Sequence, residues 1–195
     1  MQIDRLKEMI EESENIVALT GSPLLEECGY PYVRYAEAIY DIESKYGYSP
    51  DELFSLSMYN YRPELFFRYY REEVLHEKLT PSETFYALAE LERRGKVKTI
   101  ITRSIYGLCT MAGCQNVIEL RGSVLKNICP HCGRQYPVEY MMKSQKVPIC
   151  EDCFTTIRPG IILAGEMMDN RLVTQAADAI SQADMVLVLG TNLKS

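Results

Sequence analysis

Two C-x-x-C pairs constrain the fold of this chain more than any other feature. Cys129 and Cys132 form the first pair, Cys150 and Cys153 form the second, and residues 133–149 separate them. Each C-x-x-C turn bends the backbone so that both sulfurs face the same side, and four thiolates at this spacing can converge tetrahedrally on one zinc ion. The four cysteines therefore predict a structural zinc site.

Other interpretations of these cysteines remain open at the level of sequence: a redox dithiol, an iron–sulfur cluster, or a site that has lost its metal. His131 lies inside the first pair. We predict that it is a spacer facing solvent, because four cysteines already close the shell, whereas a catalytic zinc keeps an open position.

The N-terminal segment indicates a cytoplasmic protein. Residues 1–15 alternate charged and apolar side chains at helical spacing and lack the continuous apolar stretch of a signal peptide. Thiols stay reduced in the cytoplasm. We therefore expect Cys28, Cys109 and Cys114 to be core or surface thiols rather than disulfide partners.

Charge and hydropathy exclude two classes of partner. The formal net charge is −6, whereas a surface that binds nucleic acid is basic and locally clustered. Apolar runs such as residues 16–19 and 185–189 have the length of strands, far below the roughly 20 residues that cross a bilayer. We therefore expect no nucleic-acid partner and no membrane segment.

Outside the cysteine region, the pattern of the chain is that of an α/β domain. Apolar residues at helical spacing begin at Ile3 and recur after Ser82 and over 170–182, where they predict helices. Short β-prone runs predict strands at 15–20, 96–101, 116–120, 160–163 and 185–189. Strands that alternate with helices predict a mostly parallel, doubly wound sheet, in which ligands bind beyond the carboxyl ends of the strands.

Two inserts interrupt this pattern. Residues 124–156 carry the predicted zinc ribbon, and residues 30–80 hold most of the tyrosines at helical intervals. An aromatic stripe at helical spacing is more often core packing than a ligand site. We therefore predict a helical insert at 30–80 and assign it no catalytic role.

Several segments, taken in order, resemble the sirtuin family, whose members are NAD-dependent protein deacylases or ADP-ribosyltransferases. They are TGSPLLEECGYPYVR at 20–34, IITRSIYGL at 100–108, VIELRGS at 117–123, the two cysteine pairs, RPGIILAGE at 158–166 and ADMVLVLGTN at 183–192. The resemblance covers nearly the whole chain. It implies one sirtuin-like domain over 1–195, Rossmann-like, whose zinc ribbon and helical insert flank a cleft for NAD and acyl-lysine.

By this resemblance, the ligands are structural zinc together with NAD or ADP-ribose, and the partner is an acyl-lysine protein substrate or another protein. The implied cofactor-binding residues are Gly21, Ser22, Arg34, Arg103, Ser104, Gly190, Thr191 and Asn192. Within the first loop, however, Pro23 replaces a family glycine and has no N–H to offer a phosphate. Val33 replaces the family phenylalanine that shields the nicotinamide site.

Further departures fall on the residues that do the chemistry in the family. The family sequence T-Q-N-I-D, whose amide and carboxylate contact nicotinamide and ribose, reads Thr-Arg-Ser-Ile-Tyr at 102–106. The catalytic histidine, the base for a ribose hydroxyl, falls on Arg121, whose guanidinium cannot accept a proton at neutral pH. Ala164 replaces the substrate-tunnel phenylalanine, although Glu166 matches. No catalytic residue of the family is intact.

Arg121 has two interpretations: a surface arginine paired with a carboxylate, or part of an anion pocket with Arg34 and Arg103. Three functional classes follow. The chain is an enzyme that uses NAD by an altered route, with Glu27 or another carboxylate as the base; a non-catalytic binder of ADP-ribose or another anion; or a zinc-stabilised interaction protein. We expect impaired catalysis.

The last expectation concerns the end of the sequence. The chain stops shortly after Gly190, just beyond the loop with which the family contacts the phosphates of NAD. The predicted strand at 185–189 would then expose an edge, and pairing of this edge with a second copy would give a homo-oligomer.

Overall fold

The computed structural model describes residues 2–30, 36–75 and 79–191. The chain divides into two compact units. Unit 1 consists of residues 1–31, 79–121 and 168–195, and unit 2 consists of residues 32–78 and 122–167. The two predicted inserts fall mainly within unit 2, and their boundaries stay predictions.

Unit 1 contains a four-stranded parallel sheet with the order β3-β2-β1-β7. Its strands are β1 (Ile16–Thr20), β2 (Val97–Thr102), β3 (Val117–Glu119) and β7 (Met185–Leu189). The predicted strands at 15–20, 96–101, 116–120 and 185–189 are therefore confirmed. β-Branched and aliphatic side chains suit these positions because β1 and β2 are buried.

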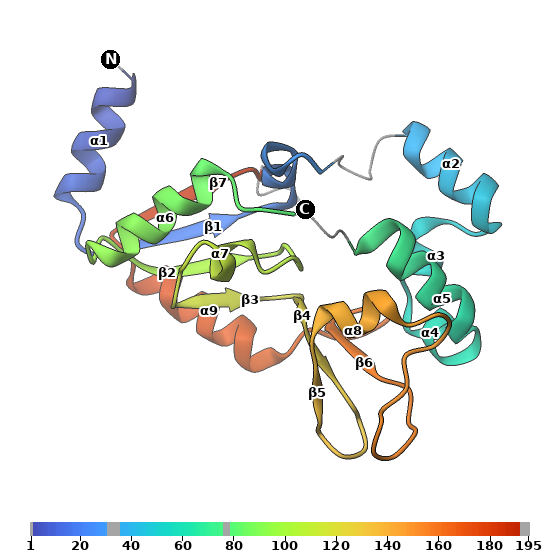
Figure 1. Cartoon of the computed structure of the whole chain (residues 1–195). Coiled ribbons are helices and arrows are strands. Elements are labelled where there is room, and N and C mark those ends of the chain that lie inside the picture. Colours follow the sequence, from blue (N-terminus) through green and yellow to red (C-terminus); the bar gives the residue numbers. More distant parts are fainter. Residues whose placement is uncertain (1, 31–35, 76–78, 192–195) are drawn as a thin grey trace. The chain divides into compact units, whose positions relative to one another are not determined.

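Helices cover both faces of this sheet. From β1 to β2 the chain proceeds toward one edge of the sheet, and from β3 to β7 it proceeds toward the opposite edge. Right-handed crossovers therefore place α6 (Glu83–Arg93) and α9 (Asn170–Gln182) on opposite faces, as Figure 1 shows. Ala176 of α9 packs on Val17 and Ile101. The predicted doubly wound α/β fold is confirmed.

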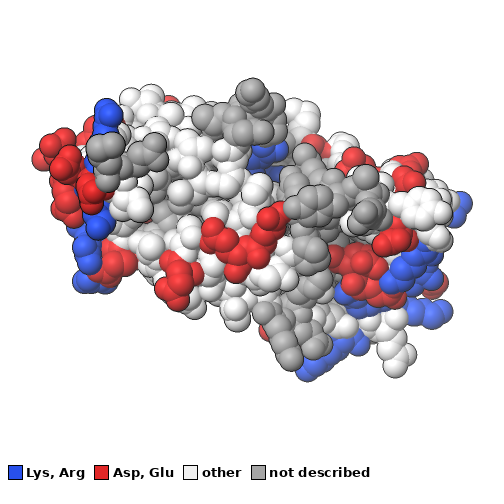
Figure 2. All heavy atoms as spheres, turned by 90° about the horizontal axis from the view of Figure 1, so that it is seen from above, with Lys and Arg blue, Asp and Glu red and all other residues white. Residues whose placement is uncertain are grey.

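The described part of unit 1 also contains three further helices. They are α1 (Gln2–Glu12), the 3₁₀ helix η1 (Ser22–Cys28) and α7 (Leu108–Met111). None of the helices within the described ranges is long and apolar enough to cross a membrane. On the face drawn in Figure 2, Asp and Glu side chains gather in several patches, as the net charge of −6 leads one to expect.

Unit 2 contains the helical insert, packed around an aromatic core. Its helices are α2 (Ala36–Tyr46), α3 (Pro50–Leu53), α4 (Leu56–Tyr61), α5 (Pro63–Tyr69) and the π-helical η2 (Tyr70–Val74). Phe66, Phe67 and Tyr70 are fully buried, and the rings of Phe66 and Tyr70 stack with centroids 5.7 Å apart. The aromatic stripe is therefore core, as predicted.

The rest of unit 2 is the ribbon, built on a three-stranded antiparallel sheet with the order β5-β4-β6. The strands are β4 (Gly122–Ile128), β5 (Gln135–Tyr136) and β6 (Arg158–Ile161), and α8 (Val138–Lys143) follows β5.

The predicted strand at 160–163 belongs to this ribbon. It overlaps β6, which spans Arg158–Ile161 and pairs with β4 in the antiparallel sheet rather than with the parallel sheet. The ribbon returns the chain beside the strand from which it left, and Gly122 and Gly160 permit the close approach. A Cβ on Gly122 would lie 2.1 Å from the carbonyl oxygen of Gly160.

Candidate metal centre and ligand-binding edge

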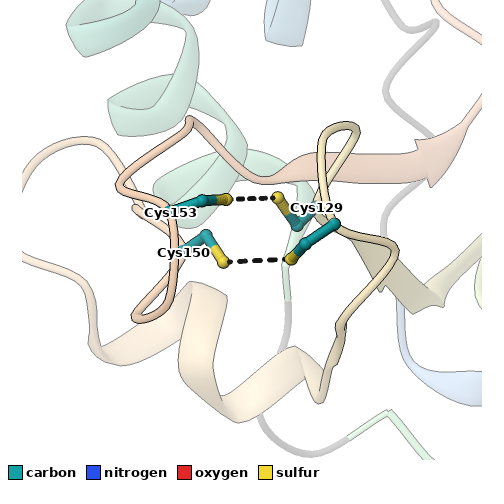
Figure 3. Close-up of side chains that lie close together, drawn as sticks. Cys129, Cys150 and Cys153 are labelled. Atoms are coloured by element: carbon teal, nitrogen blue, oxygen red, sulfur yellow. Dashed lines mark hydrogen bonds between the residues drawn. The ribbon is translucent and has the colours of Figure 1, made fainter.

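Four cysteine sulfurs meet between the two loops of the ribbon. All four Sγ atoms lie within 4.8 Å of one another. The Sγ atoms of Cys129 and Cys153 are 3.3 Å apart, and those of Cys132 and Cys150 are 3.6 Å apart. Figure 3 shows the side chain of Cys153 reaching from one loop toward Cys129 on the other, with Cys150 beside Cys153.

These distances fit zinc. Zn–S bonds of about 2.3 Å in a tetrahedron separate the sulfurs by about 3.8 Å, close to the observed spacing. A disulfide requires an S–S distance of about 2.05 Å, and all four cysteines are free thiols. His131 is exposed and does not belong to the cluster. The cluster is therefore positioned to bind zinc through four thiolates.

The two cysteine loops share one backbone design. The N–H of Cys129 donates to the carbonyl of Arg134 at 2.8 Å, and the N–H of Cys150 donates to that of Thr155 at 2.8 Å. Each loop then needs a left-handed residue at the same place, which is Gly133 with φ 77° in the first and Phe154 with φ 58° in the second. The loops are thus matched knuckles, although their sequences differ at this position.

Hydrogen bonds favour the thiolate form of Cys150. Burial alone would raise the pKa of its thiol, but hydrogen bonds from the Tyr136 hydroxyl and from the backbone N–H groups of Cys153 and Asp152 outweigh it and lower the pKa to about 6. A thiolate is the form that binds zinc. Cys150 is therefore suited to act as a thiolate ligand.

Tyr136 is a site residue that the cysteine pattern does not predict. Its hydroxyl oxygen lies 3.1 Å from Cys150 Sγ and accepts the N–H of Glu151 at 2.8 Å. Burial raises the pKa of this phenol to about 12, so it stays protonated and donates to the sulfur. The only signal in the sequence was an aromatic residue shortly after the first knuckle, which alone indicates core packing.

A second candidate site lies where the parallel strands end. Thr20, Thr102 and Glu119 stand side by side in register, and Thr20 is also level with Leu189. The residues that follow are Gly21, Ser22, Arg103, Ser104, Arg121, Gly190 and Thr191, so the sheet brings these predicted site residues to one edge. Arg34 and Asn192 lie outside the described residues, as does Val33.

At this edge, two glycines are required by close packing of the chain on itself. A Cβ on Gly21 would lie 2.1 Å from the carbonyl oxygen of Gly190, and a Cβ on Gly190 would lie 2.8 Å from Cγ of Leu24. Gly190 also has φ 60°. Both positions are therefore explained without a ligand.

The loop after β1 offers few N–H groups to a phosphate. The Gly21 N–H donates to the carbonyl of Leu189 at 2.9 Å, Pro23 has no N–H, and the Leu24 N–H donates to the carbonyl of Gly21 at 3.3 Å. Within 21–24, only Ser22 retains an N–H outside these bonds. Phosphate binding at the start of a helix relies on several such groups.

The segment after β2 is folded onto itself. The N–H of Ser104 donates to Oγ1 of Thr102 at 3.1 Å, and the hydroxyl of Ser104 accepts the N–H of Tyr106 at 3.4 Å. Tyr106 is buried and its ring lies 5.3 Å from that of Tyr30. The residue at the place of the family carboxylate is therefore part of an aromatic pair.

Two side chains named in the functional hypotheses, Arg121 and Glu27, lie beyond a strand end and in η1, respectively. Arg121 is half-buried and follows Leu120, whose N–H donates to the carbonyl of Thr102 at 3.0 Å. Oε2 of Glu27 accepts the hydroxyls of Ser82 at 2.9 Å and Thr84 at 2.6 Å. Glu27 therefore ties η1 to the start of α6.

The sequence is similar to that of a known protein family. The model described as the Sir2 family matches residues 21–195. This chain belongs to the Sir2 family. The match extends from the loop after β1 through both knuckles to β7, so it covers both the cysteine cluster and the edge where the parallel strands of this Sir2 chain end.

Relatives of this Sir2 chain include an NAD-dependent protein deacetylase of Clostridium perfringens (strain 13 / Type A), 38% identical over 192 residues, which are 98% of this chain and 79% of the relative. A crystal structure of a Sir2 homologue with NAD is 32% identical, with TM-score 0.82, covering 98% of this chain and 73% of that one. A Sir2 protein bound to acetylated peptide is 29% identical, with TM-score 0.82, covering 100% and 78%.

In unit 2, an ion pair and a hydrogen bond fix the segment that matches the family at Gly165 and Glu166. The carboxylate of Glu166 forms an ion pair with Arg158 and accepts the N–H of Leu163 at 2.7 Å. Ala164 pairs with the chain at Ser55 in a parallel bridge. Glu166 therefore fixes the backbone of this Sir2 segment in place.

Proposed function

We propose that this chain is a Sir2-family protein, of NAD-dependent protein-lysine deacylase ancestry, in which deacylation with NAD runs at or near background. The proposal rests on the arginine at position 121. Arg121 follows β3 at the edge where the strands of a doubly wound sheet present ligands, and the family resemblance places the catalytic histidine there.

NAD, when bound, supplies the ribose hydroxyl that the family's histidine deprotonates. A guanidinium has a pKa above about 12 and cannot take that proton. Loss of a general base alone typically costs about 10² to 10⁴ in rate. Glu27 is a poor replacement, because two hydroxyls already donate to the same carboxylate oxygen.

The residues that would surround the cofactor support the same proposal. By resemblance, Gly21, Ser22, Arg103, Ser104, Gly190 and Thr191 would hold NAD, with Arg34 and Asn192. The N–H groups of Gly21 and Leu24 are already used within the chain, and Pro23 has none. Tyr106 packs against Tyr30 where the family has a carboxylate. Weak binding of NAD follows, both at its phosphates and at its nicotinamide half.

A second candidate function is binding of ADP-ribose or another anion without turnover. The observation that favours it is the placement of Arg103 and Arg121 directly beyond neighbouring strands of one sheet. Arginine at such an edge binds phosphate through charge-assisted hydrogen bonds. A zinc-stabilised interaction protein is the third class, and a ligand screen without response would favour it.

The test of the first proposal is incubation of the full chain with NAD and an acetyl-lysine peptide, followed by mass spectrometry of the peptide. The Clostridium perfringens relative, assayed in parallel, shows that the peptide and conditions are adequate. We expect the relative to remove the acetyl group and this chain to leave it. Deacetylation at a comparable rate by this chain would refute the proposal.

A further inference from the structure

The hydrogen bond from Tyr136 to Cys150 connects the two halves of the metal centre. Tyr136 lies on β5, which pairs with the strand that leads into the first knuckle, through Asn127 and Tyr136. Cys150 belongs to the second knuckle. The hydroxyl is thus carried by one half of the ribbon and donates to a ligand sulfur of the other.

The position of the hydroxyl is fixed from several directions. Its oxygen accepts the N–H of Glu151 at 2.8 Å, which leaves the O–H proton for the sulfur. The ring is buried and lies 4.7 Å from that of Tyr140. The guanidinium of Arg134 lies over the ring of Tyr136, 5.3 Å from the ring centroid. Nη1 of this guanidinium contacts Asp152 at 2.7 Å, and Nη2 contacts Glu151 at 2.6 Å.

Charge explains why such a donor matters. Four thiolates around Zn²⁺ leave a net charge of −2, which a partly buried site must stabilise by hydrogen bonds or nearby cations. A hydrogen bond to a metal-bound sulfur draws electron density away from it and fixes its direction. Cys150 is fully buried, so water does not supply this bond in place of Tyr136.

We propose that Tyr136 is a positioning residue of the metal centre: its hydroxyl donates to Cys150 Sγ in the zinc-bound protein, orients this ligand, and slows the loss of zinc. This inference is independent of any NAD chemistry. It assigns to the ribbon a residue outside the C-x-x-C pairs, on which the retention of metal depends.

The experiment compares Tyr136→Phe with Tyr140→Phe. Tyr140 is a matched control in the same ribbon, because Tyr140→Phe keeps the ring that packs on Tyr136. It removes only a hydroxyl that donates to the carbonyl of Ile149 at 2.8 Å instead of to sulfur. Transfer of zinc from the purified full chain to the chelator 4-(2-pyridylazo)resorcinol is followed with time. Removal of a partner of a metal ligand typically costs about 10- to 100-fold in affinity, so we expect transfer to speed up about 10-fold or more in Tyr136→Phe only.

A spectroscopic readout separates this role from a general loss of packing. In cobalt-substituted protein, the sulfur-to-cobalt charge-transfer bands report the electron density on the thiolates. We expect these bands to move to lower energy in Tyr136→Phe and to stay unchanged in Tyr140→Phe. Unchanged bands and unchanged zinc transfer in a folded Tyr136→Phe would overturn the proposal, and so would equal effects in both variants.

If Tyr136→Phe does not fold, a measurement on the unmodified chain tests the proposal instead. Loaded with ¹¹³Cd, it should show a scalar coupling between the metal and the Tyr136 hydroxyl proton, transmitted through Cys150 Sγ. Absence of this coupling in a spectrum that resolves the proton would contradict the proposal.

Discussion

Sγ of Cys129 and Sγ of Cys153 lie 3.3 Å apart, although the two residues belong to different knuckles at opposite ends of the ribbon sequence. The antiparallel pairing of β4 with β6 brings the two knuckles together. The metal centre is therefore a product of the ribbon fold, and binding of metal and folding of the ribbon should depend on each other.

Zinc content is the first prediction. The purified chain should carry close to one zinc per molecule, and Cys129→Ser or Cys150→Ser should lower both zinc content and melting temperature, since metal binding is part of folding. Cys28→Ser, outside the cluster, is the control and should keep its zinc. Metal analysis that finds no zinc in fresh protein, with unchanged melting in chelator, would contradict this.

The second prediction concerns Phe154. The side chain of Phe154 is exposed, and its backbone is in the left-handed conformation, with φ 58°, at the place where the first knuckle has Gly133. A residue other than glycine loses roughly 1 to 2 kcal/mol of stability in the left-handed backbone conformation. Phe154→Gly should therefore raise the free energy of unfolding by about 1 kcal/mol, after the greater entropy of glycine in the unfolded chain is subtracted. Gly133→Ala should lower stability by a similar amount.

Thermal melting of zinc-loaded protein measures both changes. Gly133 has open space around its Cβ position, so Gly133→Ala tests backbone strain without a steric clash. A lower melting temperature for Phe154→Gly would show that the Phe154 side chain contributes more than its backbone costs.

Stability should depend on pH through Asp184. Hydrogen bonds from the backbone N–H of Glu14, at 2.7 Å, and then that of Asn15 lower the pKa of its carboxyl below the ordinary value of 3.8. A lowered folded-state pKa means that the stabilisation is complete above about 3.8 and is lost as the pH falls through the folded value. Asp184→Asn should therefore melt lower at pH 7.

The same difference in melting temperature should shrink as the pH falls below 3.8. Asp178→Asn is the matched control, because Asp178 is exposed on α9 and its carboxylate accepts none of the hydrogen bonds identified among the described residues. A constant difference between the Asp184 variant and the unmodified chain over the whole pH range would refute the assignment.

Much of the parallel sheet could be predicted from the sequence, because buried strands such as β1 and β2 are short runs of β-branched and aliphatic residues bounded by polar ones. The placement of β6 could not. The run at 160–163 has the same composition, and only tertiary pairing with β4 decides between the two sheets. The residue pattern of a strand does not indicate which other strand it will pair with.

The metal centre was predictable for a different reason. Zinc chemistry ties the four cysteines to a fixed spacing, so the ligands can be found in sequence. The residues that support the ligands are tied only to the folded geometry. Tyr136 reaches Cys150 through the β4–β5 pairing, and Tyr106 turns inward onto Tyr30, and neither contact leaves a spacing rule in the sequence.

The fourth prediction is a ranking of ligands. If a nucleotide binds, ADP-ribose should bind at least as well as NAD, because the changed contacts at 102–106 lie on the nicotinamide half. Arg121→Ala should weaken binding, and high salt should do the same, since hydrogen bonds to charged groups contribute about 1.5 to 3 kcal/mol each when well formed. Calorimetric titration of NAD, ADP-ribose and inorganic phosphate at two salt concentrations measures this. A clear preference for NAD would reject the ranking.

Release of nicotinamide tests the central claim most directly. The full zinc-loaded chain is mixed with NAD and an acetyl-lysine peptide at high enzyme concentration, and free nicotinamide per chain is quantified over time beside the Clostridium perfringens relative. We predict release at background, both for the unmodified chain and for Arg121→His, because a base without a correctly held cofactor has nothing to deprotonate. Nicotinamide release by the unmodified chain that depends on the peptide would contradict the account.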